Sequence, residues 1–222
     1  MHIRHARIPA TAAAILTLAV TGCASAAAHD SAASASSSMD LRAQPVAKAT
    51  SIPTGPGPQR HYTVQHQPAP GTCHVRYTRD KQPLPDPKCT PGALNPDVTP
   101  ATLDSTICRP SGYTKGIRPP YSITGKEKRA NAQSYSYNGP LADAEYDHLV
   151  SLELGGDPND PRNLWVEPPS PGHRPGAGAN NPKDVVESKL HAAICSGQVQ
   201  LRPAQVAIAT DWTTALKRLG IR

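Results

Sequence analysis

Hydrophobic and polar positions change their spacing along the second half of the chain. Over residues 145–154 they alternate with a period of two, which predicts a strand that enters a turn at Gly155-Gly156. The short segment 163–166, an asparagine followed by three apolar residues, predicts a second strand. Residues 168–182 are rich in proline and glycine, so an irregular loop is expected there.

Helical spacing follows these strands. Apolar residues three and four apart predict a helix over 183–193. A last helix is predicted over 203–219, because proline is favoured in the first turn of a helix. A shorter helix is predicted over 124–132, with Thr124 and Glu127 in the positions of a capping box. The residues expected to face inward are Val185, Val186, Leu190 and Ala193 in the first helix and Val206, Ala209, Trp212, Ala215 and Leu219 in the last.

The first half of the chain has far weaker patterning. Proline and glycine interrupt residues 60–125 so often that only irregular structure with short strands is expected. Residues 23–58 consist largely of Ala, Ser, Pro and Gly, which predicts a flexible tether. The remaining residues, 59–222, are enough for one domain.

The first residues have the pattern of an export signal. Arg4 and Arg7 precede an apolar stretch, residues 10–20, which is too short to span a bilayer as a stable helix. The sequence Val-Thr-Gly before Cys23 resembles the lipobox of bacterial lipoproteins, in which this cysteine is lipidated. Residues 1–22 are therefore interpreted as a lipoprotein signal peptide. The expected location is the outer face of the cell membrane, held by the lipid. An ordinary secretory signal, with a secreted product, is the alternative.

The remaining cysteines indicate disulfide bonds. Besides Cys23 the chain contains Cys73, Cys89, Cys108 and Cys195, an even number for an oxidising compartment. None belongs to a Cys-x-x-Cys pair, which argues against a zinc ribbon. Three connectivities are possible. We favour Cys73–Cys89, which closes a local proline-rich loop, together with Cys108–Cys195.

Composition limits the core and the choice of partners. The chain has no phenylalanine, 4% aromatic residues and 25 prolines, so its core is expected to be modest and to depend on disulfides. The formal net charge of +6 favours polyanions such as nucleic acid. Anionic lipid headgroups and wall polymers would satisfy the same charge, so the charge does not choose among them.

A short polar motif lies on the predicted strands. It consists of Tyr146-Asp147-His148-Leu149, then Gly155-Gly156, then Asn163-Leu164. This motif resembles the HNH (His-Me finger) endonuclease superfamily, within a group of exported bacterial HNH-like proteins. The resemblance implies a small disulfide-stabilised α+β domain that contains a ββα-metal motif, at about residues 144–195, and an additional C-terminal helix. The Asp-Arg-Gly-His signature of related nonspecific nucleases is missing, which favours the HNH branch.

The resemblance also implies the roles of three residues. Asp147 corresponds to a metal ligand, His148 to the general base, and Asn163 to the residue that orients the catalytic histidine. A carboxylate suits Mg²⁺ or Mn²⁺, and a neutral imidazole can take a proton from water as the water attacks phosphorus. Consecutive strand residues face opposite ways, so Asp147 and His148 can serve one site only if the strand is irregular there.

A second metal ligand is implied near the start of the helix. Asn181 is the preferred candidate, Asn180 comes next, and His173 in the same loop is weaker. His191 is expected to be a hydrogen-bonded structural histidine. The expected cofactor is one divalent ion, Mg²⁺ or Mn²⁺.

Basic residues supply candidate substrate contacts. Arg118 and Lys183 are the candidate phosphate ligands, whereas the cluster at 126–129 is equally well explained as a solvated basic face. The leading hypothesis is metal-dependent hydrolysis of phosphodiester bonds in nucleic acid, with DNA favoured over RNA as the substrate. Little sequence preference is expected, because nothing resembles a base-reading module. The alternative is a non-enzymatic cell-envelope lipoprotein whose degenerate finger binds a polymer or a partner protein.

Overall fold

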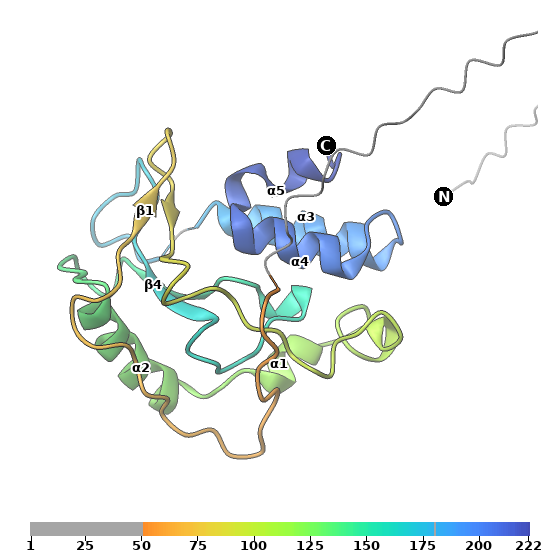
Figure 1. Ribbon diagram of the computed structural model, residues 1–222, viewed down its shortest axis with the longest axis horizontal. Helices are drawn as coiled ribbons and strands as arrows, with labels where there is room; N and C mark the ends of the chain where they lie inside the picture. The colour runs from red at the N-terminus through yellow and green to blue at the C-terminus, as the bar shows by residue number, and fades with distance from the viewer. Residues whose placement is uncertain (1–50, 180) are drawn as a thin grey trace, which may run out of the picture. The chain divides into compact units, whose positions relative to one another are not determined.

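The computed structural model describes residues 51–179 and 181–222 and combines helices with two small sheets (Figure 1). The signal peptide, Cys23, most of the predicted tether and Asn180 lie outside the described residues. Within the described ranges no helix has both the length and the apolar character needed to cross a membrane. The elements are β1 (Arg76–Tyr77), β2 (Pro83–Leu84), η1 (Leu103–Ser105), α1 (Tyr113–Ile117), α2 (Tyr121–Ser134), β3 (Glu145–His148), η2 (Leu152–Leu154), β4 (Leu164–Glu167), α3 (Lys183–Cys195), α4 (Leu201–Thr210) and α5 (Trp212–Arg218).

The two predicted strands form an antiparallel hairpin, β3 and β4. The first is much shorter than the predicted segment 145–154, because β3 ends at His148 and the chain then turns through η2. The side chain of Asn163 explains this early end. Its Oδ1 accepts from the amide of Val150 at 3.0 Å, and its Nδ2 donates to the carbonyl of Val150 at 3.0 Å. Both backbone groups of Val150 are thus taken by Asn163 and not by a partner strand.

Helix α2 packs on β4 through a polar contact. Asn131 accepts a hydrogen bond from the amide of Val166 at 2.7 Å, so the helix satisfies a backbone group at the edge of the strand. The predicted capping box at residues 124–127 is wrong, because α2 begins three residues earlier, after Pro120. Glu127 lies on the buried face and accepts from the amide of Gln65 at 2.7 Å.

The three C-terminal helices pack together on the other side of the hairpin (Figure 1). The predicted helix over 203–219 is in fact two helices, α4 and α5. Asp211 leaves the helical region, with φ −168° and ψ 101°, and its side chain caps α5 by accepting from the amide of Thr213. Val185 was expected inside but is 60% exposed, whereas Leu190 and Ile194 of the same helix are buried.

The apolar core is divided between the two sides. A large cluster surrounds the three C-terminal helices and a small one surrounds Trp165 of β4, whose ring lies 5.7 Å from that of Tyr135. The large cluster contains Ile52, Leu84, Val98, Ile107, Val150, Leu154, Leu190, Ile194, Leu201, Ala204, Ala207, Ile208, Trp212 and Ala215.

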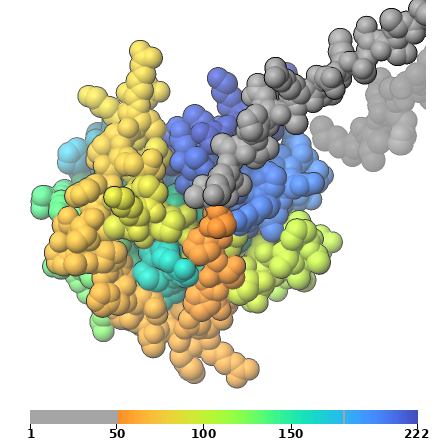
Figure 2. All heavy atoms as spheres, in the orientation of Figure 1, coloured from red at the N-terminus to blue at the C-terminus, as the bar shows by residue number. Residues whose placement is uncertain are grey.

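The folded domain begins before residue 59, the boundary predicted from composition. Ile52 is 8% exposed and belongs to the large cluster. The amide of Gly55 donates to the carbonyl of Leu94 at 2.8 Å, and the amide of Gly57 donates to Asp157 at 2.7 Å. Figure 2 shows this orange segment lying along the surface of the domain. Its backbone hydrogen bonds make it part of the domain despite a composition typical of a tether.

Both favoured disulfides are formed. Cys73–Cys89 has a sequence separation of 16 and lies beside the Trp165 cluster. Cys108–Cys195 has a separation of 87 and joins the segment after η1 to the last residue of α3. The pairing predicted from the sequence is confirmed.

Candidate active site at the β3–β4 hairpin

Acidic side chains gather on the hairpin. Glu145 of β3 pairs directly with Glu167 of β4, and Asp147 lies two residues further along β3, on the same face as Glu145. Like charges in such positions destabilise a sheet. Asp147 is 6% exposed and Glu167 only 2%, so burial adds to this cost. A charge of opposite sign is required nearby.

That charge is Lys183, the first residue of α3. Its ammonium donates to Asp147 Oδ2 at 2.8 Å, to the main-chain carbonyl of His148 at 2.8 Å and to Glu187 Oε1. Burial by itself lowers the pKa of Lys183, but the charges of Asp147 and Glu187 outweigh it and raise the pKa above its ordinary value. An ammonium has three donors, so every proton of this fully buried group is used.

Several carboxyl groups near Lys183 hold protons more tightly than usual. Burial and then the charge of Asp147 raise the pKa of Glu145 to about 7. Burial raises the pKa of Glu187 to about 8, although Lys183 acts in the opposite direction. Asp147 is therefore the carboxylate whose negative charge Lys183 most directly balances.

Glu167 is the most perturbed carboxyl group. Both of its oxygens are buried without a hydrogen-bond partner, as is Nδ2 of Asn181. Burial and then the charge of Asp147 raise the pKa of Glu167 well above its ordinary value. A raised pKa favours the neutral form of Glu167, which reduces the repulsion between the two buried acids.

The imidazole of His148 faces a different partner. Its Nε2 lies 3.0 Å from the carbonyl of Pro158, which can only accept, so Nε2 carries the hydrogen. Burial lowers the pKa of His148 to about 4, and the charges of Arg118 and Lys183 act in the same direction. The ring is therefore neutral near pH 7. Among the described residues its second nitrogen, Nδ1, has no hydrogen-bond partner.

Asn163 acts on His148 only indirectly. The sequence predicts that it orients the histidine, but in the described residues it makes no hydrogen bond to the imidazole. Besides its bonds to Val150, its Nδ2 donates to the carbonyl of Asp157 at 3.0 Å. It therefore holds the loop that carries Pro158, and Pro158 in turn fixes the ring of His148.

The two predicted phosphate ligands are placed differently. Arg118 is exposed and lines a hollow together with Ser151, Asp184 and Glu187. Lys183 is 1% exposed and its protons are bound to Asp147, Glu187 and a carbonyl, so this arrangement leaves it no donor for a substrate phosphate. Of the two, Arg118 is the side chain open to a ligand.

The other candidate histidines have local partners. Nε2 of His173 lies 3.4 Å from Asp143 Oδ1. Nε2 of His191 lies 2.8 Å from the carbonyl of Ile107, as expected for a structural histidine. Neither histidine forms a hydrogen bond or an ion pair with Asp147 or His148 in the described part of the chain.

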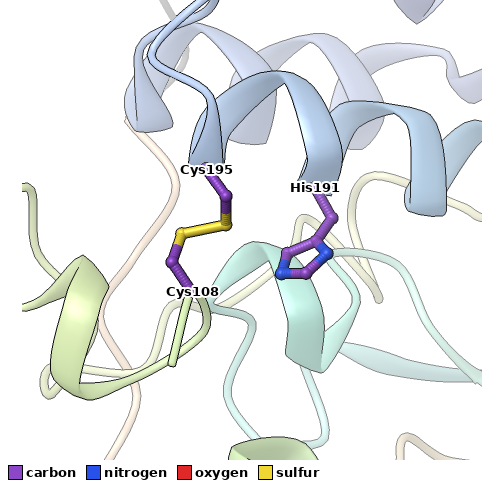
Figure 3. A group of neighbouring side chains, drawn as sticks. All are labelled: Cys108, His191 and Cys195. Carbon is purple, nitrogen blue, oxygen red and sulfur yellow. A yellow bond between two sulfur atoms is a disulfide. The ribbon is translucent and has the colours of Figure 1, made fainter. Parts of the chain in front are cut away.

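His191 also lies beside the second disulfide (Figure 3). Its ring and the sulfurs of Cys108 and Cys195 lie within 4.8 Å of one another, the kind of group that could hold a metal ion. The two sulfurs are bonded to each other, however. Cysteine binds a metal ion as a thiolate. Neither Cys108 nor Cys195 is a thiolate while the disulfide is formed, so the group lacks its two sulfur ligands.

Two predicted ligands of a divalent ion, Asp147 and Asn181, have other partners in the structure. Asp147 is occupied by Lys183, and Oδ1 of Asn181 accepts from the backbone amide of Lys183 at 2.9 Å. Across residues 51–179 and 181–222, only Cys108, His191 and Cys195 bring three potential ligand atoms of His, Cys, Asp or Glu within 4.8 Å of one another. The acidic hairpin therefore has the residue types for a hard cation but not the geometry.

Sequence patterns could have identified part of this cluster. Glu187 follows Lys183 by four residues, the spacing of a helical ion pair. Glu145 shares a strand face with Asp147 by the period of two. Glu167 and Pro158 have no such signal, because only the pairing of β3 with β4 and the closing of the loop bring them to Asp147 and His148.

Comparisons of the chain with protein-family models, with curated proteins and with solved structures gave no match.

Proposed function

We propose that the protein hydrolyses phosphodiester bonds in nucleic acid, with His148 as the general base and with DNA favoured over RNA as the substrate. The observation that carries this proposal is the state of the imidazole. It is neutral, Pro158 fixes its Nε2, and Nδ1 keeps a free lone pair. A base in this state can accept a proton near neutral pH without first losing one.

The proposed reaction forms one bond, breaks one bond and moves two protons. A water oxygen attacks phosphorus while its proton passes to Nδ1 of His148. The bond from phosphorus to the 3′ oxygen breaks, and that oxygen takes a proton from solvent. Arg118, exposed at the hollow, offers a guanidinium that can bind two phosphate oxygens and offset their charge.

The order of the elements supports the proposal. Two antiparallel strands followed by a helix, with Asp147 and His148 on the first strand, is the order of the ββα finger that the motif resembles. Lys183 on the helix binds both the side chain of Asp147 and the main chain of His148. The helix therefore fixes the end of the strand that carries the proposed base.

The direct test is cleavage of plasmid DNA and of single-stranded RNA by the purified full-length protein. His148→Ala should lower the rate by about 10²–10⁴-fold, the usual contribution of a general base. His191→Ala is the matched control, because it removes another imidazole outside the site. Thermal melts of both variants must show that the fold persists. Unchanged cleavage by a folded His148→Ala protein would remove the assignment.

The pH profile gives a second, independent readout. Because burial lowers the pKa of His148 to about 4, the base stays neutral in mildly acidic solution. The acid limb of kcat/KM should therefore lie near pH 4 and not near the ordinary pKa of about 6.5. An acid limb at the ordinary histidine value would contradict the assignment of this buried ring as the base.

Export and anchoring belong to the same proposal. The two disulfides support an oxidising compartment, in which such bonds persist. We propose that Cys23 carries a lipid that holds the domain at the outer face of the membrane. Cys23→Ala should move the protein from the membrane fraction to the soluble fraction while cleavage is unchanged. Full solubility of the wild-type protein would contradict the anchor.

One observation favours a second function, binding without catalysis. His148 is 7% exposed, and Lys183 is closed off by its partners, as in a scaffold that has lost access to substrate. In that case the exposed Arg118 would contribute to binding of a polyanion in the cell envelope. A gel shift with DNA that depends on Arg118, without cleavage under any condition, would select this alternative.

A further inference from the structure

The position next to Asp147 already contains a cation. The ammonium of Lys183 lies 2.8 Å from Asp147 Oδ2 and 2.8 Å from the carbonyl of His148, and it also binds Glu187. A Mg²⁺ ion coordinated by Asp147 would need the same carboxylate at about 2.0–2.1 Å. The two cations would repel each other. Water could not hydrate either of them, because Lys183 is only 1% exposed.

A second predicted metal ligand near Asp147 is also engaged by Lys183. Oδ1 of Asn181, the oxygen that would serve a metal, accepts from the amide of Lys183 at 2.9 Å. The ammonium and the backbone amide of Lys183 thus engage Asp147 Oδ2 and Asn181 Oδ1, the oxygens of two predicted metal ligands.

We infer that Lys183 is the resident cation of this site, occupying the place at Asp147 that a divalent ion would take, so that the protein binds neither Mg²⁺ nor Mn²⁺ there and cleaves without one. The statement about cleavage rests on the proposed function, whereas the statement about binding does not. Lys183 is a positioning residue, because it touches Asp147 and the main chain of His148 and not the substrate. The charge of the substrate phosphate is then offset by Arg118.

The first test is a titration of the full-length wild-type protein with Mn²⁺. Electron paramagnetic resonance measures the concentration of the free ion at each step. Asp147→Asn is the reference variant, because it keeps the shape of the side chain and removes its charge. We expect identical titrations of the two proteins. Binding by the wild type that is lost in Asp147→Asn would overturn the inference.

Cleavage gives a second test on the same protein. Treatment with EDTA should leave the rate within about twofold, whereas an enzyme that depends on one metal ion would lose its activity. Loss of activity in EDTA that Mg²⁺ or Mn²⁺ restores would overturn the inference. Absence of cleavage under every condition would remove the proposed function, and the Mn²⁺ titration would still decide whether Lys183 is the resident cation.

Removal of Lys183 should create the metal site that it prevents. In Lys183→Ala the carboxylate of Asp147 loses its cation, so Mn²⁺ should bind there and stabilise the variant. At about 100 times the dissociation constant, the melting temperature should rise by roughly 5–10 °C. Lys189→Ala, which removes an exposed lysine of the same helix, should show no such rise. A folded Lys183→Ala protein without this gain would overturn the inference, and if the variant does not fold the wild-type titration decides alone.

Discussion

The two ends of α3 lie in surroundings of opposite character. Near its C-terminal end, Leu190 and Ile194 pack into the apolar cluster with Trp212. At its N-terminal end, Lys183 and Glu187 are also buried, but among carboxyl groups and backbone carbonyls. One helix thus joins an apolar region, in which burial stabilises the fold directly, to an ionic region in which burial is costly.

The difference indicates what each end is for. Burying a leucine side chain contributes about 1.5–3 kcal/mol to stability. A buried ion pair is often no more stabilising than apolar residues of the same volume, because both charges lose their hydration. The apolar end therefore accounts for stability, and the ionic end is better explained by the position that it gives to Asp147 and to the strand end at His148.

The largest expected effect concerns the disulfide that fastens the apolar end. Cys108→Ala/Cys195→Ala opens a loop with a sequence separation of 87, which should cost roughly 4–5 kcal/mol of unfolding free energy. Cys73→Ala/Cys89→Ala opens one with a separation of 16 and should cost about 3 kcal/mol. Urea denaturation of the two double variants measures the contrast. A larger loss from the shorter loop would show that loop entropy does not govern this domain.

The next effect tests the ionic end. Lys183→Met should lower the unfolding free energy by about 3–5 kcal/mol, because it leaves the carboxylate of Asp147 buried without its cation and Glu187 without its hydrogen-bond donor. Adding Asp147→Asn and Glu187→Gln to the same protein should recover much of this loss, since no unpaired charge remains. Lys189→Met on the same helix should change stability by less than about 0.5 kcal/mol. A triple variant as unstable as Lys183→Met alone would contradict the role of charge.

The apolar end should respond to volume and not to charge. Leu190→Ala removes a fully buried side chain and should cost about 2–5 kcal/mol, through lost burial and the cavity that remains. Val185→Ala on the same helix is the control, because Val185 is 60% exposed and should change stability by less than about 0.5 kcal/mol. Equal losses in both variants would mean that the packing of α3 differs from the structure.

The smallest expected effect is a change of the unfolding free energy with pH. The pKa of Glu167 is raised in the folded protein, so the folded state keeps a proton that the unfolded state releases. Its contribution to stability is therefore complete at low pH and is lost as the pH rises above the unfolded pKa, by up to about 1.4 kcal/mol per pH unit. Glu167→Gln should flatten this decline between about pH 5 and 8. An unchanged slope would mean that Glu167 is ionised in the fold.

Local patterns determined much of the architecture from the sequence. The hairpin, α3 and the division into a patterned second half and an irregular first half follow from periodicity and from proline and glycine. The favoured cysteine pairs were also correct. These features depend on residues that are close in the chain, or on side chains such as cysteine that have few possible partners.

Only the tertiary structure decided how the polar residues meet. A lysine is almost never fully buried unless it is paired, so the sequence favoured an exposed Lys183 that binds phosphate. The pairing of β3 with β4 brings Glu167 to Asp147, and the start of α3 then places Lys183 between Asp147 and Glu187. Helix periodicity could not foresee this, because burial of a charge depends on which opposite charges surround it, and these come from segments far apart in the chain.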